Sequence, residues 1–180
     1  MEKFSIESEY KFGSGRYWQQ FGALSHAGEE VKRLGKKAYI IGGRTALSLA
    51  EPAMVTSLKQ SGIVWEEERY SGLPSLCKAQ ELSRRAADTD CDVIVGVGGG
   101  RAIDLAKMVA VERKCPVIAV PTSAATCAAF APLSILYHED GRYDRCVRHG
   151  DEVNAVLVDM SLRVRQPPRL LACGILDAMG

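Results

Sequence analysis

The chain has 180 residues and a mass of 19.5 kDa, and 47% of its residues are hydrophobic, which suffices for one domain with a buried core. Its 23 basic and 22 acidic side chains give a net charge of +1 with no long run of either sign, so the sequence indicates no nucleic-acid-binding surface. The first ten residues, MEKFSIESEY, carry charges where a signal peptide needs an apolar core, and we expect a cytoplasmic protein.

The hydrophobic period switches repeatedly between strand-like and helix-like spacing, which is typical of a parallel sheet with crossover helices. In the first half, the expected elements are a helix over Tyr17–Leu34, a strand over Ala38–Ile41, a helix over Thr45–Gln60, a strand over Ile63–Tyr70 and a helix over Pro74–Ala87. Thr45 is the expected cap of the second helix. Pro74 is expected to open the third, because proline is favoured in a first helical turn.

The second half continues the alternation. Its expected elements are a strand over Val93–Val97, a helix over Arg101–Glu112, a strand over Val117–Val120, a strand around Ile135 and a strand over Val153–Val158. The segment Glu139–Gly141 predicts a hairpin turn between Tyr137 and Tyr143. We therefore expect an α/β fold with a Rossmann-like parallel sheet flanked by helices.

The segment Cys115–Tyr137 contains no charged residue over 23 positions, a length that could cross a membrane. Its three prolines and the polar residues between them break a helix, so a buried strand followed by a loop fits better, and we expect no membrane association. The six cysteines of the chain show no CxxC pair and no regular spacing, which suits reduced thiols.

The segment Ile94–Lys107 has the order of a buried strand, a three-glycine turn and a helix start. Without side chains, successive glycines let backbone N–H groups face an anion where the helix dipole also favours negative charge. The pattern predicts a phosphate cradle, although three glycines also suit a plain tight turn. It matches neither GxGxxG, which needs glycine in place of Arg101, nor the GK[ST] ending of a P-loop. Asp104 and Lys107 also suit an exposed i,i+3 pair.

Ligands of such a sheet bind beyond the carboxyl ends of the strands. Three loops of this chain are predicted to lie at that edge: Gly42–Arg44, Gly98–Arg101 and Pro121–Cys127.

Four segments carry a resemblance to a known family: GVGGGRAIDLAK at 96–107, PTSAATCAAFAPLSILYHEDGRY at 121–143, VLVD at 156–159 and PPRLLACGILDAMG at 167–180. In order and spacing, the chain resembles the iron-containing alcohol dehydrogenase and glycerol dehydrogenase superfamily along essentially its whole length. The resemblance implies a dehydroquinate synthase-like fold, with a nucleotide-binding α/β domain at 1–165. Residues 166–180 would then be the first helix of a C-terminal, all-helical, metal-binding domain that is otherwise absent.

The resemblance also implies a set of site residues. Gly98, Gly99 and Gly100 would hold the pyrophosphate of NAD(P)(H), with Asp104 near it. The rest of the cofactor groove would be formed by Gly43, Arg44, Arg101, Thr122, Ser123, Leu133 and Tyr137. Asp177 matches the first ligand of a divalent metal, iron or zinc, which polarises the substrate oxygen in the complete enzyme. No residue of this chain is assigned a catalytic role.

The family supplies the other metal ligands as histidines of the helical domain. The histidines of this chain, His26, His138 and His149, form no metal-spaced pair, and we expect them at the surface or in loops. The isolated chain is therefore expected to be the cofactor-binding half of a two-domain enzyme and to be inactive alone.

Two positions depart from the glycerol dehydrogenase pattern. Where those enzymes have Thr-Asp, this chain has Thr126-Cys127, so Cys127 either lines a less polar substrate pocket or fills a packed loop. Where NAD-selective relatives carry an acid after the second strand, this chain has Gly43-Arg44. Without an acid nothing repels a 2′-phosphate, and Arg44 could pair with one, so we expect NADP(H) to be accepted.

The expected function is metal-dependent hydride transfer between a nicotinamide cofactor and a small alcohol, polyol or carbonyl substrate, by a homo-oligomer when full length. The alternative is a non-catalytic nucleotide-binding fragment or module, or one half of a split enzyme. Dehydroquinate synthase shares the fold, but its substrate site carries charged residues that PTSAATCAAF lacks. Small-molecule kinases need an acid within the glycine run, which is also absent.

Overall fold

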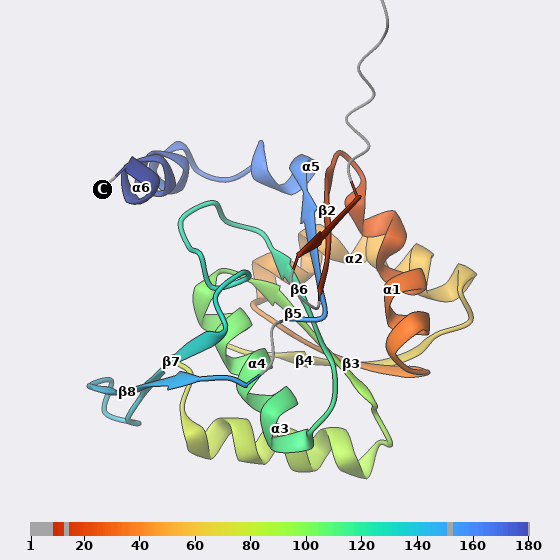
Figure 1. Ribbon diagram of the computed structural model, residues 1–180, viewed down its shortest axis with the longest axis horizontal. Coiled ribbons are helices and arrows are strands. Elements are labelled where there is room, and N and C mark those ends of the chain that lie inside the picture. Colours follow the sequence, from red (N-terminus) through yellow and green to blue (C-terminus); the bar gives the residue numbers. More distant parts are fainter. Residues whose placement is uncertain (1–8, 13–14, 151–152, 180) are drawn as a thin grey trace, which may run out of the picture.

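The computed structural model describes residues 9–12, 15–150 and 153–179, which form an α/β fold (Figure 1). The strands are β1 (Glu9–Phe12), β2 (Gly15–Gln20), β3 (Lys37–Gly42), β4 (Val64–Arg69), β5 (Val93–Gly98), β6 (Val117–Pro121), β7 (Leu133–Tyr137), β8 (Tyr143–Arg148) and β9 (Ala155–Asp159). The helices are η1 (Ala23–His26), α1 (Ala27–Leu34), α2 (Arg44–Gln60), α3 (Leu76–Asp88), α4 (Gly100–Arg113), α5 (Met160–Arg163) and α6 (Pro168–Met179).

Within these residues, seven strands form the main sheet in the order β1-β2-β9-β6-β5-β3-β4. Every neighbouring pair is parallel except β1 and β2. The remaining strands, β7 and β8, form a separate antiparallel hairpin that packs on α4. The predicted α/β class and parallel sheet are thereby confirmed, as is the hairpin turn at Glu139–Gly141.

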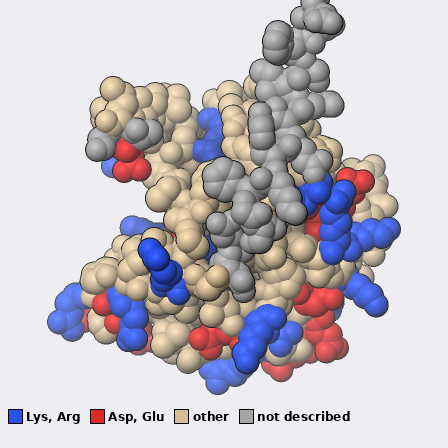
Figure 2. Space-filling view, viewed as in Figure 1, with Lys and Arg blue, Asp and Glu red and all other residues tan. Residues whose placement is uncertain are grey.

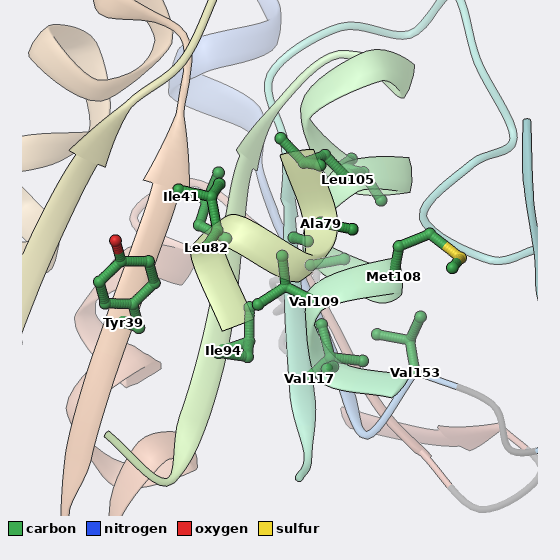
Figure 3. Packing of buried hydrophobic residues seen from close by; sticks show 14 of the residues in the cluster. Tyr39, Ile41, Ala79, Leu82, Ile94, Leu105, Met108, Val109, Val117 and Val153 are labelled. Carbon is green, nitrogen blue, oxygen red and sulfur yellow. The ribbon is translucent and has the colours of Figure 1, made fainter. Parts of the chain in front are cut away.

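Helices cover both faces of the sheet, because successive side chains of a strand point to opposite faces. In β3, Ala38 and Ile40 pack with residues of α1 and α2, whereas Tyr39 and Ile41 pack with residues of α3 and α4. Figure 3 shows the second of these cores, which the hydrophobic residues of α4 fill. Burial on both faces explains why the central strands are continuous apolar runs in the sequence.

The predicted helix over Tyr17–Leu34 is wrong in its first half. Gly15–Gln20 is strand β2, which pairs in parallel with β9, and only Ala27–Leu34 forms an α-helix. Tyr17 packs against one core and Trp18 against the other, which is the two-residue period of a strand, and aromatic residues favour that conformation. Gly22 then takes a φ of 74°, a left-handed conformation that separates β2 from η1.

Two helix starts also differ from expectation. The cap of α2 is Gly43 rather than Thr45. Helix α3 begins after Pro74, because the side chain of Ser75 accepts a hydrogen bond from the backbone N–H of Lys78 and so caps the helix. The uncharged segment Cys115–Tyr137 forms β6, a loop and β7, as expected. Among the described residues, no helix is long and apolar enough to cross a bilayer.

The carboxyl ends of β3, β5, β6 and β9 lie at one edge of the sheet, and the segment from α5 to α6 runs above that edge (Figure 1). Buried Asp159, at the end of β9, fixes this arrangement. Its carboxylate accepts hydrogen bonds from the backbone N–H groups of Gly22, Leu24 and Ser161 at 2.9–3.1 Å. One carboxylate therefore joins the start of α5 to the turn that precedes α1.

Candidate functional site

A groove of about 820 Å³ lies at the carboxyl edge of the sheet. Its walls are the loops that follow β3, β4, β5 and β6, together with the segment from α5 to α6. The structure thus brings the three predicted loops together. Eight of the predicted cofactor residues line the groove: Gly43, Arg44, Gly98, Gly99, Gly100, Arg101, Thr122 and Ser123.

In the turn between β5 and α4, Gly98 takes a backbone conformation that suits glycine, and Gly100 allows a close contact with the loop after β6. Gly98 has a φ of 150°, which L side chains rarely adopt, and its carbonyl accepts a hydrogen bond of 3.0 Å from Thr122 N–H. A Cβ on Gly100 would lie 2.9 Å from Thr126 Oγ1. Both contacts draw the loop after β6 close to the turn. Gly99, in contrast, has open space where its Cβ would be.

Two helix N-termini open into this groove. Helix α4 is preceded by Gly99 and α2 by Gly43, and neither glycine supplies a side chain to cap the first-turn N–H groups. Such N–H groups and the helix dipole favour an anion. The glycine turn is therefore open to a phosphate and is not closed by a capping side chain.

The charged side chains that line the groove are all cationic. Arg44, Arg101 and Arg165 line it, and no aspartate or glutamate among the described residues does. Arg101 also lies near Tyr70: burial raises the pKa of the Tyr70 phenol, and the Arg101 charge opposes that rise. Arg165 and Tyr70 were missed by sequence analysis, because only the tertiary fold places the α5–α6 segment and the end of β4 beside the glycine turn.

Asp104 does not line the groove. It is buried on α4, where its carboxylate pairs with Lys107 Nζ at 2.9 Å and accepts a hydrogen bond from Ile135 N–H at 3.2 Å. Lys107 Nζ also donates to the carbonyls of Ala128, at 2.8 Å, and of Leu133. The pair is buried rather than exposed. It fastens α4 to the loop between β6 and β7.

Three further predicted residues lie outside the groove lining. Leu133 and Tyr137 belong to hairpin strand β7, on the side of α4 that packs against the hairpin. Exposed Cys127 begins a turn, and its carbonyl accepts hydrogen bonds from Phe130 and Ala131 N–H at 2.8 and 3.0 Å. Their assigned roles toward cofactor and substrate stay predictions.

The described residues do not bring together the ligands that a metal ion would need. Asp177 is exposed on α6, and no three histidine, cysteine, aspartate or glutamate side chains gather around a common point in the described part of the chain. His26 stacks on Trp18 with ring centroids 3.8 Å apart, and His149 hydrogen-bonds Ser134. The described residues alone do not form a metal site.

Helix α6 is held to the groove but presents apolar side chains outward. A Cβ on Gly174 would lie 2.4 Å from the Ala124 carbonyl oxygen, so the helix packs directly on the loop after β6. Its exposed hydrophobic side chains are Leu170, Leu171, Ile175, Leu176 and Met179. In Figure 2 the α6 lobe, at the upper left, is mostly uncharged, whereas charged side chains gather lower on the molecule. An apolar face of this kind is typical of an interaction surface.

Comparison with known proteins decides the family. Residues 14–159 match the model of the iron-containing alcohol dehydrogenase family. The chain belongs to this family. Within it, the chain is 35% identical to the glycerol dehydrogenase of Pseudomonas putida and 33% identical to that of Escherichia coli, over 92% of its own length in each case.

Solved structures of the family agree with the fold. The crystal structure of glycerol dehydrogenase from Schizosaccharomyces pombe superposes with a TM-score of 0.83 at 30% sequence identity over 96% of this chain. That alignment covers 44% of the yeast protein, and the two bacterial enzymes are covered over 45% of their lengths. The chain thus spans less than half the length of these relatives and corresponds to their N-terminal region.

Proposed function

We propose that this chain is the nicotinamide-dinucleotide-binding part of an oxidoreductase that interconverts an alcohol or polyol and its carbonyl. The observation that carries the proposal is the open glycine turn at the mouth of α4, inside a groove whose charged residues are all arginines. A dinucleotide pyrophosphate carries the charge that such a site favours. The names of the relatives, which are glycerol dehydrogenases, support the reaction class.

Different residues of the groove bind different parts of the dinucleotide. The backbone N–H groups at the start of α4 hold the pyrophosphate, and Gly99, where a Cβ would meet open space, lets it approach the main chain. Leu49, Leu162 and Leu170 supply apolar surface for the aromatic rings of the ligand. When bound, the nicotinamide ring exchanges a hydride with the substrate. No aspartate, glutamate, histidine or lysine among the described residues lines this groove.

The rest of the enzyme is proposed to dock on α6. We place the boundary at residue 166, so that α6 begins a helical metal-binding domain to which Asp177 contributes one ligand. The apolar side chains exposed on α6 would be buried in that interface. The full-length protein is proposed to act in the cytoplasm as a homo-oligomer. The alternative is a dinucleotide-binding module without activity, and the groove itself is compatible with both proposals.

The test is calorimetric titration of this chain with NADH and NADPH, with Gly99→Val as the variant. Because a Cβ on Gly99 meets open space, the variant keeps the fold, and replacing glycine at this N-cap costs about 1 kcal/mol of stability. The valine side chain then occupies the cradle, so binding of both dinucleotides should be lost while circular dichroism is unchanged. If neither dinucleotide binds the unsubstituted chain, or if Gly99→Val binds them equally well, the proposal is wrong.

A further inference from the structure

We infer that the groove selects a dinucleotide with a third phosphate group, on the 2′ position of the adenosine ribose, and so prefers NADP(H) to NAD(H). The inference rests on the proposed function and specifies its cofactor. Three features carry it: the place of the loop after β3, the unpaired arginines of the groove and the open space at Gly43.

The loop after β3 lies beside the glycine turn. Strands β3 and β5 are parallel neighbours, with Gly42 of β3 opposite Val97 of β5, so Gly43 and the glycine turn follow adjacent strand ends. A ribose joined to a pyrophosphate on the glycine turn can reach that neighbouring loop. In dinucleotide-binding folds an acid at this place accepts hydrogen bonds from the ribose hydroxyls, and an arginine accommodates a 2′-phosphate. This chain offers Gly43 and Arg44.

The groove carries more positive charge than is needed to balance the two negative charges of a pyrophosphate. Arg44, Arg101 and Arg165 line it without any acidic residue, and no carboxylate among the described residues pairs with them. The uncapped N-termini of α2 and α4 add partial positive charge. The two pyrophosphate charges of NAD leave this field partly unbalanced. A 2′-phosphate adds a charge of about −1.5 to −2.

Gly43 makes the inference testable without damage to the fold. Its backbone, with φ −72° and ψ 148°, suits any residue, and a Cβ there would have only the Tyr70 carbonyl oxygen nearby, at 3.9 Å. Aspartate is moreover a favoured N-cap, so Gly43→Asp should fold at least as well as the natural chain. The new carboxylate would repel a 2′-phosphate and accept hydrogen bonds from the ribose hydroxyls.

The experiment measures the binding of NADPH and NADH by calorimetry, at low and at high salt. Four proteins are compared: the full 180-residue chain, the variants Gly43→Asp and Arg44→Gln, and the control variant Arg84→Gln. Arg84 is exposed on α3 and lies outside the groove. Its side chain donates a hydrogen bond to the Gln80 carbonyl. A charge-assisted contact predicts that NADPH binds ~10-fold or more tighter than NADH to the natural chain, with the advantage smaller at high salt. Arg44→Gln should lower NADPH affinity more than NADH affinity, and Gly43→Asp should reverse the preference.

The outcomes separate this inference from the proposed function. Equal affinities, or tighter binding of NADH by the natural chain, would overturn the inference and leave the proposed function standing. A preference for NADPH that persists unchanged in both groove variants, or that also disappears in Arg84→Gln, would likewise overturn it. Failure of both dinucleotides to bind would overturn the proposed function and the inference together.

Discussion

Lys107 offers the sharpest test of how the site is held together. Its ammonium is almost fully buried, pairs with Asp104 at 2.9 Å, and donates to the carbonyls of Ala128, Ala131 and Leu133. Substitution by methionine keeps a flexible chain of similar length but removes the charge and every donor. Lys107→Met therefore leaves the Asp104 carboxylate buried without its cation and three carbonyls without this partner.

The magnitude follows from the burial of the pair. Removing one member of a buried ion pair costs about 3–5 kcal/mol, because the other charge is stranded. Burial lowers the pKa of Lys107 despite the opposing effect of Asp104, so desolvation already offsets part of the attraction. We therefore take the lower end, about 3 kcal/mol. For a domain of this size that corresponds to a fall in Tm of about 6–12 °C.

Thermal unfolding followed by circular dichroism measures this change. The control is Lys114→Met, which removes an exposed lysine at the end of the same helix and should leave Tm within about 2 °C. The double variant Asp104→Asn with Lys107→Met removes the stranded charge and keeps an acceptor for Ile135 N–H, so it should be more stable than Lys107→Met alone. A Lys107→Met chain as stable as the control, or a double variant less stable than the single one, would refute the argument.

Three other changes have defined outcomes. Asp159→Asn should cost about 2–3 kcal/mol in chemical denaturation, because the buried carboxylate accepts several hydrogen bonds from N–H groups around η1 and α5. Burial, reinforced by the Lys107 charge, lowers the pKa of His149 in the folded chain. As the pH falls, the imidazole is therefore protonated more readily in the unfolded chain than in the folded one. Stability should then decline as the pH falls below about 6.5, and less so in His149→Gln. Gly174→Ala should lower Tm through its clash with the loop after β6, whereas Leu176→Glu, at a side chain 68% exposed, should not.

The local sequence pattern was sufficient to predict the central strands and the edge of the sheet at which the candidate site lies. Strands β5 and β6 are uninterrupted apolar runs because both of their faces are buried, and the loops at their carboxyl ends follow from the parallel arrangement. Strand β2 was not predictable in this way. Its partner β9 lies more than 130 residues later in the chain, so the pairing that makes Gly15–Gln20 a strand is absent from any local window.

The same limit applies to individual site residues. The i,i+3 spacing of Asp104 and Lys107 indicates that they meet, but not that the loop between β6 and β7 folds over them and buries both. Arg165 follows α5 in a segment without a motif. It joins the groove because the α5–α6 segment is held over the sheet edge, by Asp159 at the start of α5 and by Gln166, whose Oε1 accepts a hydrogen bond from Ala124 N–H at 3.1 Å. In both cases the missing information is a tertiary contact.

Helix α4 connects the two walls of the groove. Its N-terminus presents the glycine turn, and two turns later Lys107 holds the loop whose first residues, Thr122 and Ser123, form the facing wall. Both walls are thus fixed to one helix by contacts within this chain. Dinucleotide binding should therefore survive in the isolated chain, whereas no turnover is expected from it, because the proposed metal-dependent reaction needs more ligands than its described residues bring together. Measurable affinity for NADPH together with no oxidation of glycerol is the combination that this arrangement predicts.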